Sequence, residues 1–282
     1  LRLPGAGPLT WSGSLNSATA PTSLTGGVLV NAGVLEIADA AALGSTSNVV
    51  AVSNQTGAVV ALPGGINLPN QVVLNLGASS EAGFFAGNGI GTLVSTSGTN
   101  TVSGLVNMNT HGGVGAAAGA TLNITGGASL IGRVLSFDGP GTINVSGSSL
   151  TGNGGLYKLG SGTTTITTSV AAPSGFGVRN YGGGGALVFS GTGAVGSTTQ
   201  IDYIFGGGAI RLDNTAVNVV NRLGAASPLD VRDGTLQFAA SPSAASIESF
   251  STLTASHGYT NIVVETTGQA STLNFLNITI NV

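Results

Sequence analysis

The chain has 282 residues, of which 48 are glycine, none is cysteine and only 6% are charged. Average soluble domains contain ~25% charged residues and ~7% glycine, so this composition is unusual for a globular enzyme. The lack of cysteine excludes a disulfide framework and a cysteine zinc site. A net charge of −3 with only seven Lys and Arg leaves no basic stripe to neutralise phosphates, so nucleic acid is not an expected partner.

Apolar residues make up 41% of the chain, but Gly, Ser, Thr or Asn interrupts every apolar run. No run approaches the ~20 residues of a spanning helix, so no transmembrane segment is expected. Aliphatic and β-branched residues recur throughout, which distinguishes the chain from disordered sequences. The chain begins at Leu1 without the pattern of a signal peptide, and we expect a processed protein or a segment of a longer one.

Short alternating runs between turn residues predict β-strands along the whole chain. They occupy residues 27–30, 33–37, 58–62, 71–76 and 235–238. The only helix-like patch is 37–43, where Asp39 is placed to cap a short turn. The predicted fold class is therefore all-β.

An internal period organises these strands. The hexapeptides 119–124, 140–145 and 161–166 start 21 residues apart, and similar segments follow at 184–189, 207–212 and 233–238. When the first three are aligned, Leu122, Ile143 and Thr164 fall in one column, and Ile124, Val145 and Ile166 fall in another. Between them lies a polar column of Asn123, Asn144 and Thr165. Repeats of this length with short strands are typical of the coils of a β-solenoid.

We therefore predict a single parallel β-solenoid domain over residues 1–282, with about a dozen irregular coils of roughly 21–26 residues. Neighbouring coils would satisfy each strand edge, inward aliphatic side chains would form one stack, and outward Thr and Asn would form ladders. A β-sandwich is an alternative, but it predicts hairpin turns every 8 to 12 residues and no constant register. An outer-membrane barrel requires aromatic girdles, which 5% aromatic residues do not provide.

Three stretches resemble the autotransporter-associated β-strand repeat. Residues 24–37, followed by Ala-Leu-Gly at 42–44, resemble its two strands, its Asn-Ala-Gly turn and its corner. Residues 156–163 match its Leu-x-Lys-x-Gly-x-Gly-Thr pattern. Residues 221–224 and 233–236 resemble a companion pattern of large planctomycete-type surface proteins, with Asp233 in place of the first Gly. The resemblance implies a right-handed β-helix that is extracellular or at the cell surface, as a passenger or stalk, and it supplies no catalytic residues.

Polysaccharide lyases and hydrolases also use β-helices, and they need clustered carboxylates. The candidates for such a groove are Asp202, Arg211, Asp230 and Arg232. The period of two places Asp230 and Arg232 on one face, but the ten acidic residues are scattered, so we favour surface ion pairs. Aromatic residues such as Tyr157 and Tyr203 would line a sugar-binding groove or, as we prefer, fill the interior.

No cofactor or metal is expected, because neither His111 nor His257 has a second ligand at a suitable spacing. The segment 271–282 is strongly β-prone and uncharged. It predicts a strand with an unpaired edge that can pair with a strand of another subunit. The candidate assembly residues are Leu273, Phe275, Leu276, Ile278, Ile280 and Val282.

The functional hypothesis is a non-enzymatic extracellular structural protein, a subunit of a cell-surface fibre or stalk that self-associates through terminal strands. One alternative is a monomeric surface adhesin passenger, with surface glycans as candidate partners. A second alternative is a polysaccharide-active β-helix enzyme.

Overall fold

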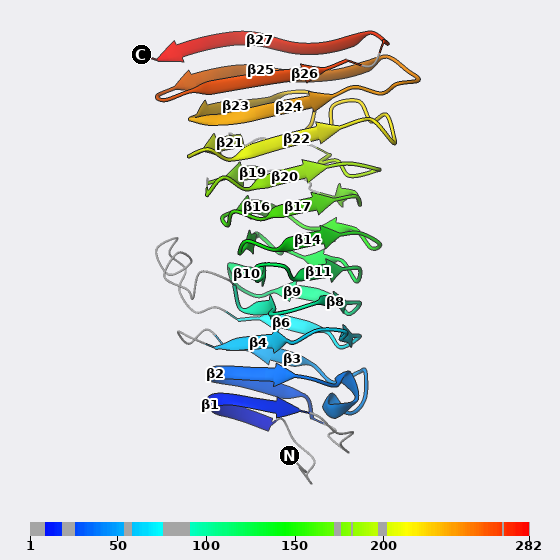
Figure 1. Cartoon of the computed structure of the whole chain (residues 1–282), viewed down its shortest axis with the longest axis vertical. Coiled ribbons are helices and arrows are strands. Elements are labelled where there is room, and N and C mark those ends of the chain that lie inside the picture. Colours follow the sequence, from blue (N-terminus) through cyan, green and yellow to red (C-terminus); the bar gives the residue numbers. More distant parts are fainter. Residues whose placement is uncertain are drawn as a thin grey trace.

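The chain forms a stack of coils that rises from the amino-terminal end to the carboxyl-terminal end (Figure 1). The computed structural model describes residues 26–53, 58–75, 91–171, 176–181, 183–196, 202–266 and 268–281, and the backbone alone of 9–18. Every strand pairing in these parts is parallel and joins one coil to another. The prediction of an all-β parallel β-solenoid is confirmed.

The described strands form two sheets that run the length of the stack. The 9-stranded sheet contains β5 (Asn67–Leu68), β8 (Thr99–Val102), β11 (Thr121–Ile124), β14 (Thr142–Val145), β17 (Thr163–Ile166), β20 (Ala186–Phe189), β22 (Ala209–Asp213), β24 (Gly234–Ala239) and β26 (Thr260–Glu265). The 18-stranded sheet contains β1 (Leu9–Ala18), β2 (Val28–Ile37), β3 (Val50–Val52), β4 (Val59–Leu62), β6 (Val72–Leu74), β7 (Leu93–Ser95), β9 (Val106–Met108), β10 (Gly112–Ala116), β12 (Ala128–Ser129), β13 (Arg133–Asp138), β15 (Leu150–Thr151), β16 (Gly154–Lys158), β18 (Val170–Ala171), β19 (Gly177–Asn180), β21 (Asp202–Phe205), β23 (Ser227–Arg232), β25 (Ser246–Ser256) and β27 (Ser271–Asn281).

The register of the 9-stranded sheet reproduces the columns derived from the period. Leu122 pairs with Ile143 and Ile143 with Thr164, while Asn123 pairs with Asn144. The same register continues into β20, β22 and β24, as the later, looser repeats predicted.

The pairings of the 18-stranded sheet link twelve successive strands from β1 to β27, in line with the dozen irregular coils expected. Coil length varies more than the aligned repeats suggest. Asn109 lies directly above Asn75, and 34 residues separate them, against 21 between Asn123 and Asn144.

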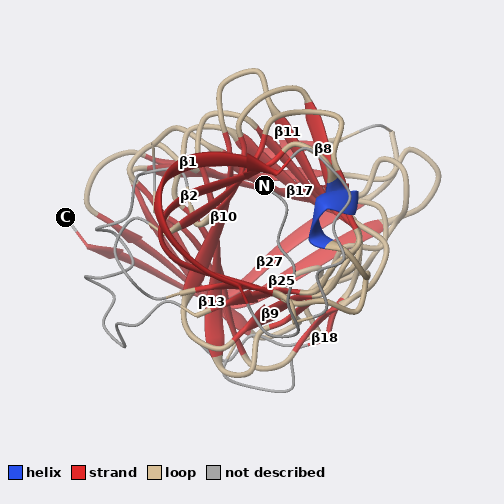
Figure 2. Cartoon of the chain, turned by 90° about the horizontal axis from the view of Figure 1, so that it is seen from below, coloured by secondary structure: helices blue, strands red, loops and turns tan. Residues whose placement is uncertain are grey.

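Figure 2 shows the coils end-on, with the strands arranged around the axis of the stack. The buried side chains that point toward this axis form one continuous apolar core. Alternate residues point inward, so Leu122 and Ile124 of β11 are fully buried while Asn123 between them is partly exposed. The Nδ2 of Asn144 donates to the Oδ1 of Asn123 at 2.9 Å. This contact confirms the predicted outward ladder of polar side chains.

The helix-like patch is a short 3-10 helix, η1 (Ala40–Leu43), and Asp39 caps it as predicted. The Asp39 carboxylate accepts a hydrogen bond from the N–H of Ala41 at 2.9 Å.

Glycine is required at corners where the backbone of one coil lies directly against the backbone of the next. A Cβ at Gly162 would lie 1.9 Å from the carbonyl oxygen of Gly141. In the described parts of the chain, no helix is long and apolar enough to cross a membrane.

Candidate functional site

The four groove candidates occupy three different settings. Asp202 begins β21 and is fully buried, with its carboxylate accepting the N–H of Val178 at 2.8 Å. Its register partner in the next coil is the core residue Leu229. Asp202 therefore points into the solenoid, where it satisfies a backbone group of the preceding coil.

Asp230 and Arg232 lie on the outer face of β23 and form an ion pair. The Nη2 of Arg232 is 2.6 Å from the Oδ2 of Asp230, and Ser256 donates to the other carboxylate oxygen at 2.9 Å. The prediction that these two residues share a face is confirmed. Asp233 follows at a bend, with a φ of 55°.

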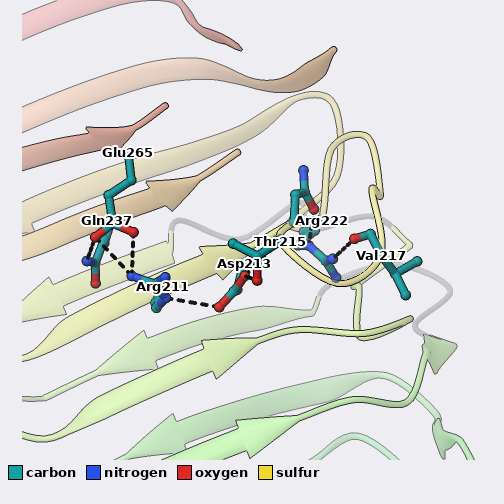
Figure 3. Close-up of polar contacts among 8 residues, drawn as sticks. Arg211, Asp213, Thr215, Val217, Arg222, Gln237 and Glu265 are labelled. Atoms are coloured by element: carbon teal, nitrogen blue, oxygen red, sulfur yellow. Dashed lines mark hydrogen bonds and ion pairs between the residues drawn. The ribbon is translucent and has the colours of Figure 1, made fainter. Parts of the chain in front are cut away.

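Arg211 lies on β22 of the other sheet, between two carboxylates (Figure 3). Its Nε is 3.2 Å from Asp213, and its Nη1 is 3.0 Å from Glu265, which also accepts a hydrogen bond from Gln237. Burial opposes ionisation of Asp213, but hydrogen bonds from Thr215 and Arg211 hold its pKa below the usual value. Arg211 thus ties its own coil to β26.

The structure therefore does not bring the four groove candidates together on one face. Within the described residues, no group of three or more His, Cys, Asp or Glu side chains could hold a metal ion. His111 uses its Nδ1 to accept the N–H of Val134 at 3.0 Å.

A ladder of tyrosine and arginine lies on the outer face of the 18-stranded sheet. The guanidinium carbon of Arg179 is 5.0 Å from the ring centre of Tyr157 and 5.1 Å from that of Tyr203. Arg232 approaches Tyr203 at 5.4 Å from the next coil. Contacts of this kind contribute roughly 0.5–1 kcal/mol each at exposed sites. Because cations cover these rings, the ladder favours a role in holding coils together over stacking on a sugar.

The aromatic side chains thus divide between two locations. Phe176 is fully buried, as the preferred interpretation predicted. The tyrosines of the ladder instead occupy outward positions, where Tyr157 is covered to 7% exposure and Tyr181 packs edge-on against it with ring centres 5.2 Å apart.

Charged residues also enter the interior. Arg222 is fully buried and donates to the carbonyl oxygens of Gly191, Gly193 and Val217, the last at 2.6 Å (Figure 3). Its backbone N–H, with that of Leu223, binds the buried carboxylate of Glu248 at 2.7 and 3.1 Å. Burial raises the pKa of Glu248 to about 7 and lowers that of Arg222. These groups fix a long turn to the coils on either side.

Lys158 is a further buried charged residue and the only lysine of the chain. Its Nζ donates to the carbonyl oxygen of Gly160. Burial lowers its pKa to about 8, while the negative charge of Asp138 opposes that shift. Arg222, Glu248 and Lys158 were not among the candidate site residues predicted from the sequence, whereas the buried Asp202 was. The alternation of Leu156 and Lys158 did place both on one face, but a lysine there would ordinarily be assigned to solvent.

The last described strand, β27, carries five of the six predicted assembly residues. Leu273 and Phe275 pack against the core, and Phe275 stacks on Phe250 with ring centres 5.5 Å apart. Leu276, Ile278 and Ile280 are 79%, 61% and 72% exposed. Val282 lies outside the described residues.

Scans against protein-family models, curated proteins and solved structures returned no match.

Proposed function

We propose that the protein is a non-enzymatic structural protein of the extracellular space or cell surface, a subunit of a fibre or stalk that assembles through its terminal strands. The observation that carries the proposal is the uncovered face and edge of β27. Among the described strands, β27 pairs with β25 alone, and three of its large aliphatic side chains are exposed.

The exposed isoleucines occupy positions that lie in the core of lower coils. Ile278 continues the column of Leu229 and Leu253, both buried, and Ile280 continues the column of Val231 and Ala255. One more parallel strand on top would therefore bury both isoleucines and pair the free backbone groups of β27.

A second copy of the chain can supply that strand. At the opposite end of the stack, β1 pairs with β2 alone among the described strands, and its direction is parallel to all the others. The open edge of β1 is thus complementary to the open edge of β27. A head-to-tail contact of this kind is heterologous and propagates into a filament.

The surface chemistry and the resemblance support the same role. With 6% charged residues, many already in ion pairs, the outer face has little charge to oppose association. The resemblance to autotransporter-associated repeats supports an exported stalk. The separation of Asp202, Arg211 and Asp230 gives no support to a polysaccharide-cleaving groove.

The test is the oligomeric state of the 282-residue chain, compared with the double variant Ile278→Lys, Ile280→Lys. We expect the unaltered chain to form concentration-dependent polymers by light scattering and sedimentation, and the variant to stay monomeric with an unchanged circular dichroism spectrum. Charges on the end face would repel the next subunit and remain unpaired on burial.

The matched control is Ile131→Lys, which places the same charge at a 59% exposed isoleucine outside the terminal strand. This variant should polymerise like the unaltered chain. A monodisperse monomer of the unaltered chain at high concentration would contradict the proposal and favour the monomeric adhesin or the enzyme.

A further inference from the structure

One inward column of the 18-stranded sheet is apolar except at two adjacent positions. In register order it contains Val60, Leu93, Val114, Phe137, Lys158, Asn180, Ile204, Val231 and Ala255. Lys158 and Asn180 stack directly on each other in consecutive coils, and both are fully buried. The only lysine of the chain therefore lies in the core beside a carboxamide.

The amine and the carboxamide converge on the same turn. A Cβ at Gly185 would lie 3.1 Å from the Nζ of Lys158, and the Nδ2 of Asn180 donates to the carbonyl oxygen of Gly185 at 2.8 Å. Neighbouring strands are ~4.8 Å apart, so the two side chains leave the backbone at that spacing on the same inward face. Both side chains are fully buried and approach the same residue, Gly185.

The surroundings raise the share of the uncharged amine, the form that is nucleophilic. Burial lowers the pKa of Lys158 to about 8. Asp138 ends β13 in the preceding coil, and its Oδ1 would lie 2.9 Å from a Cβ at Gly160, the residue whose carbonyl oxygen accepts a hydrogen bond from Lys158. Burial raises the pKa of this carboxyl group, and its charge is coupled to that of Lys158. A carboxyl group with a raised pKa is suited to passing a proton during the reaction.

We propose that Lys158 and Asn180 condense to an intramolecular isopeptide bond that joins two consecutive coils. The Nζ attacks the Cγ of Asn180, a C–N bond forms, and the bond from Cγ to Nδ2 breaks. Asp138 transfers a proton from Nζ to the departing nitrogen, which leaves as ammonia. Amine and carboxamide give a secondary amide and ammonia, so the reaction needs no oxidant or further reactant.

The product relieves an energetic cost and adds a mechanical link. A buried cation becomes a neutral amide, which removes the desolvation penalty of the ammonium group. The new bond closes a covalent loop around one coil, so unfolding from either end would stop at this point. Such a clamp suits a rod, in which each coil otherwise contacts only its neighbours.

The experiment combines the intact mass with a count of reactive amines on the denatured full chain. We expect a mass lower than the sequence mass by one ammonia, and no more labels from an amine-specific reagent than the Lys158→Arg variant accepts. Ring closure of an asparagine onto the backbone would lose the same mass but leave the lysine amine reactive. Peptide mapping should then recover Lys158 and Asn180 in one branched peptide.

Variants locate the reaction. Lys158→Arg and Asn180→Ala should show the full sequence mass, whereas Asn144→Ala, which removes an outward asparagine, should still lose ammonia. Asp138→Ala should condense more slowly, and condensation at the normal rate would overturn the role of Asp138. The full sequence mass for the unaltered chain, or one additional label relative to Lys158→Arg, would overturn the isopeptide bond itself.

Discussion

Thr164 is a buried hydroxyl in a column of aliphatic residues. It lies between Ile143 and Leu187, is fully buried, and its Oγ1 has no hydrogen-bond partner among the described residues. An unsatisfied buried polar group costs ~1–3 kcal/mol, so Thr164→Val should raise the free energy of unfolding by about 1 kcal/mol. Denaturant unfolding would measure the change.

The neighbouring Thr165 provides the control, because it lies on the same strand with its side chain partly exposed. Thr165→Val should change the free energy of unfolding by less than ~0.5 kcal/mol. An equal gain from both substitutions would show that strand propensity, and not the buried hydroxyl, is responsible.

Glu248 makes stability depend on pH. In the unfolded chain its carboxyl group has the ordinary pKa of 4.5, whereas burial raises the pKa to about 7 in the native state. The native state therefore binds more protons between these values, and its free energy of unfolding falls as pH rises from about 4.5 to about 7. The loss is on the order of 2 kcal/mol.

Thermal unfolding across this pH range measures the effect. In Glu248→Gln the group no longer titrates, so the slope between pH 4.5 and about 7 should flatten. The same slope in both proteins would assign the pH dependence to other carboxyl groups.

Residue-scale features were only partly predictable from the sequence. The pairing of Asp230 with Arg232 and the cap at Asp39 follow from local spacing, and both were predicted correctly. The burial of Arg222 depends on carbonyl groups of Gly191 and Gly193, about 30 residues earlier in the chain. No local sequence pattern predicts this burial, because the long turn that brings Arg222 to these carbonyl groups does not recur in other coils.

At the scale of elements, stacked corners require glycine. A Cβ at Gly162 would lie 1.9 Å from the oxygen of Gly141, whereas at Gly196 the nearest atom is 4.0 Å away. Gly162→Ala must separate two coils and should destabilise the fold by at least ~2 kcal/mol. Gly196→Ala should change stability by less than ~0.5 kcal/mol.

Thermal unfolding of the two glycine variants gives the comparison. If Gly162→Ala unfolds at the same temperature as the unaltered chain, the corners of successive coils are not in the close contact described here.

The elements themselves were predictable where the period is constant. The columns that begin at Leu122 and Asn123 were confirmed pair by pair, because three coils of equal length repeat the same inward and outward pattern. Where one coil uses 34 residues, the spacing no longer gives the register. Hydrophobic pattern thus determines which face is buried, and coil length must come from the structure.

For the whole molecule, the outer surface and the ends have different chemistry. On the outside of the stack, charged and tyrosine side chains contact one another in ion pairs and in the tyrosine–arginine ladder. The end at β27 instead presents exposed Leu276, Ile278 and Ile280 beside an edge that no other described strand covers. The sequence predicted this strand, but the burial of Leu273 and Phe275 in the core could be assigned only from the coil below.

The most direct test of end-to-end assembly is electron cryo-microscopy of the purified 282-residue chain without added ligand. We predict unbranched filaments whose strands lie perpendicular to the axis at a spacing of ~4.8 Å, with an axial repeat equal to one stack of coils. Isolated short rods at every concentration, with β27 exposed at one end, would contradict the account.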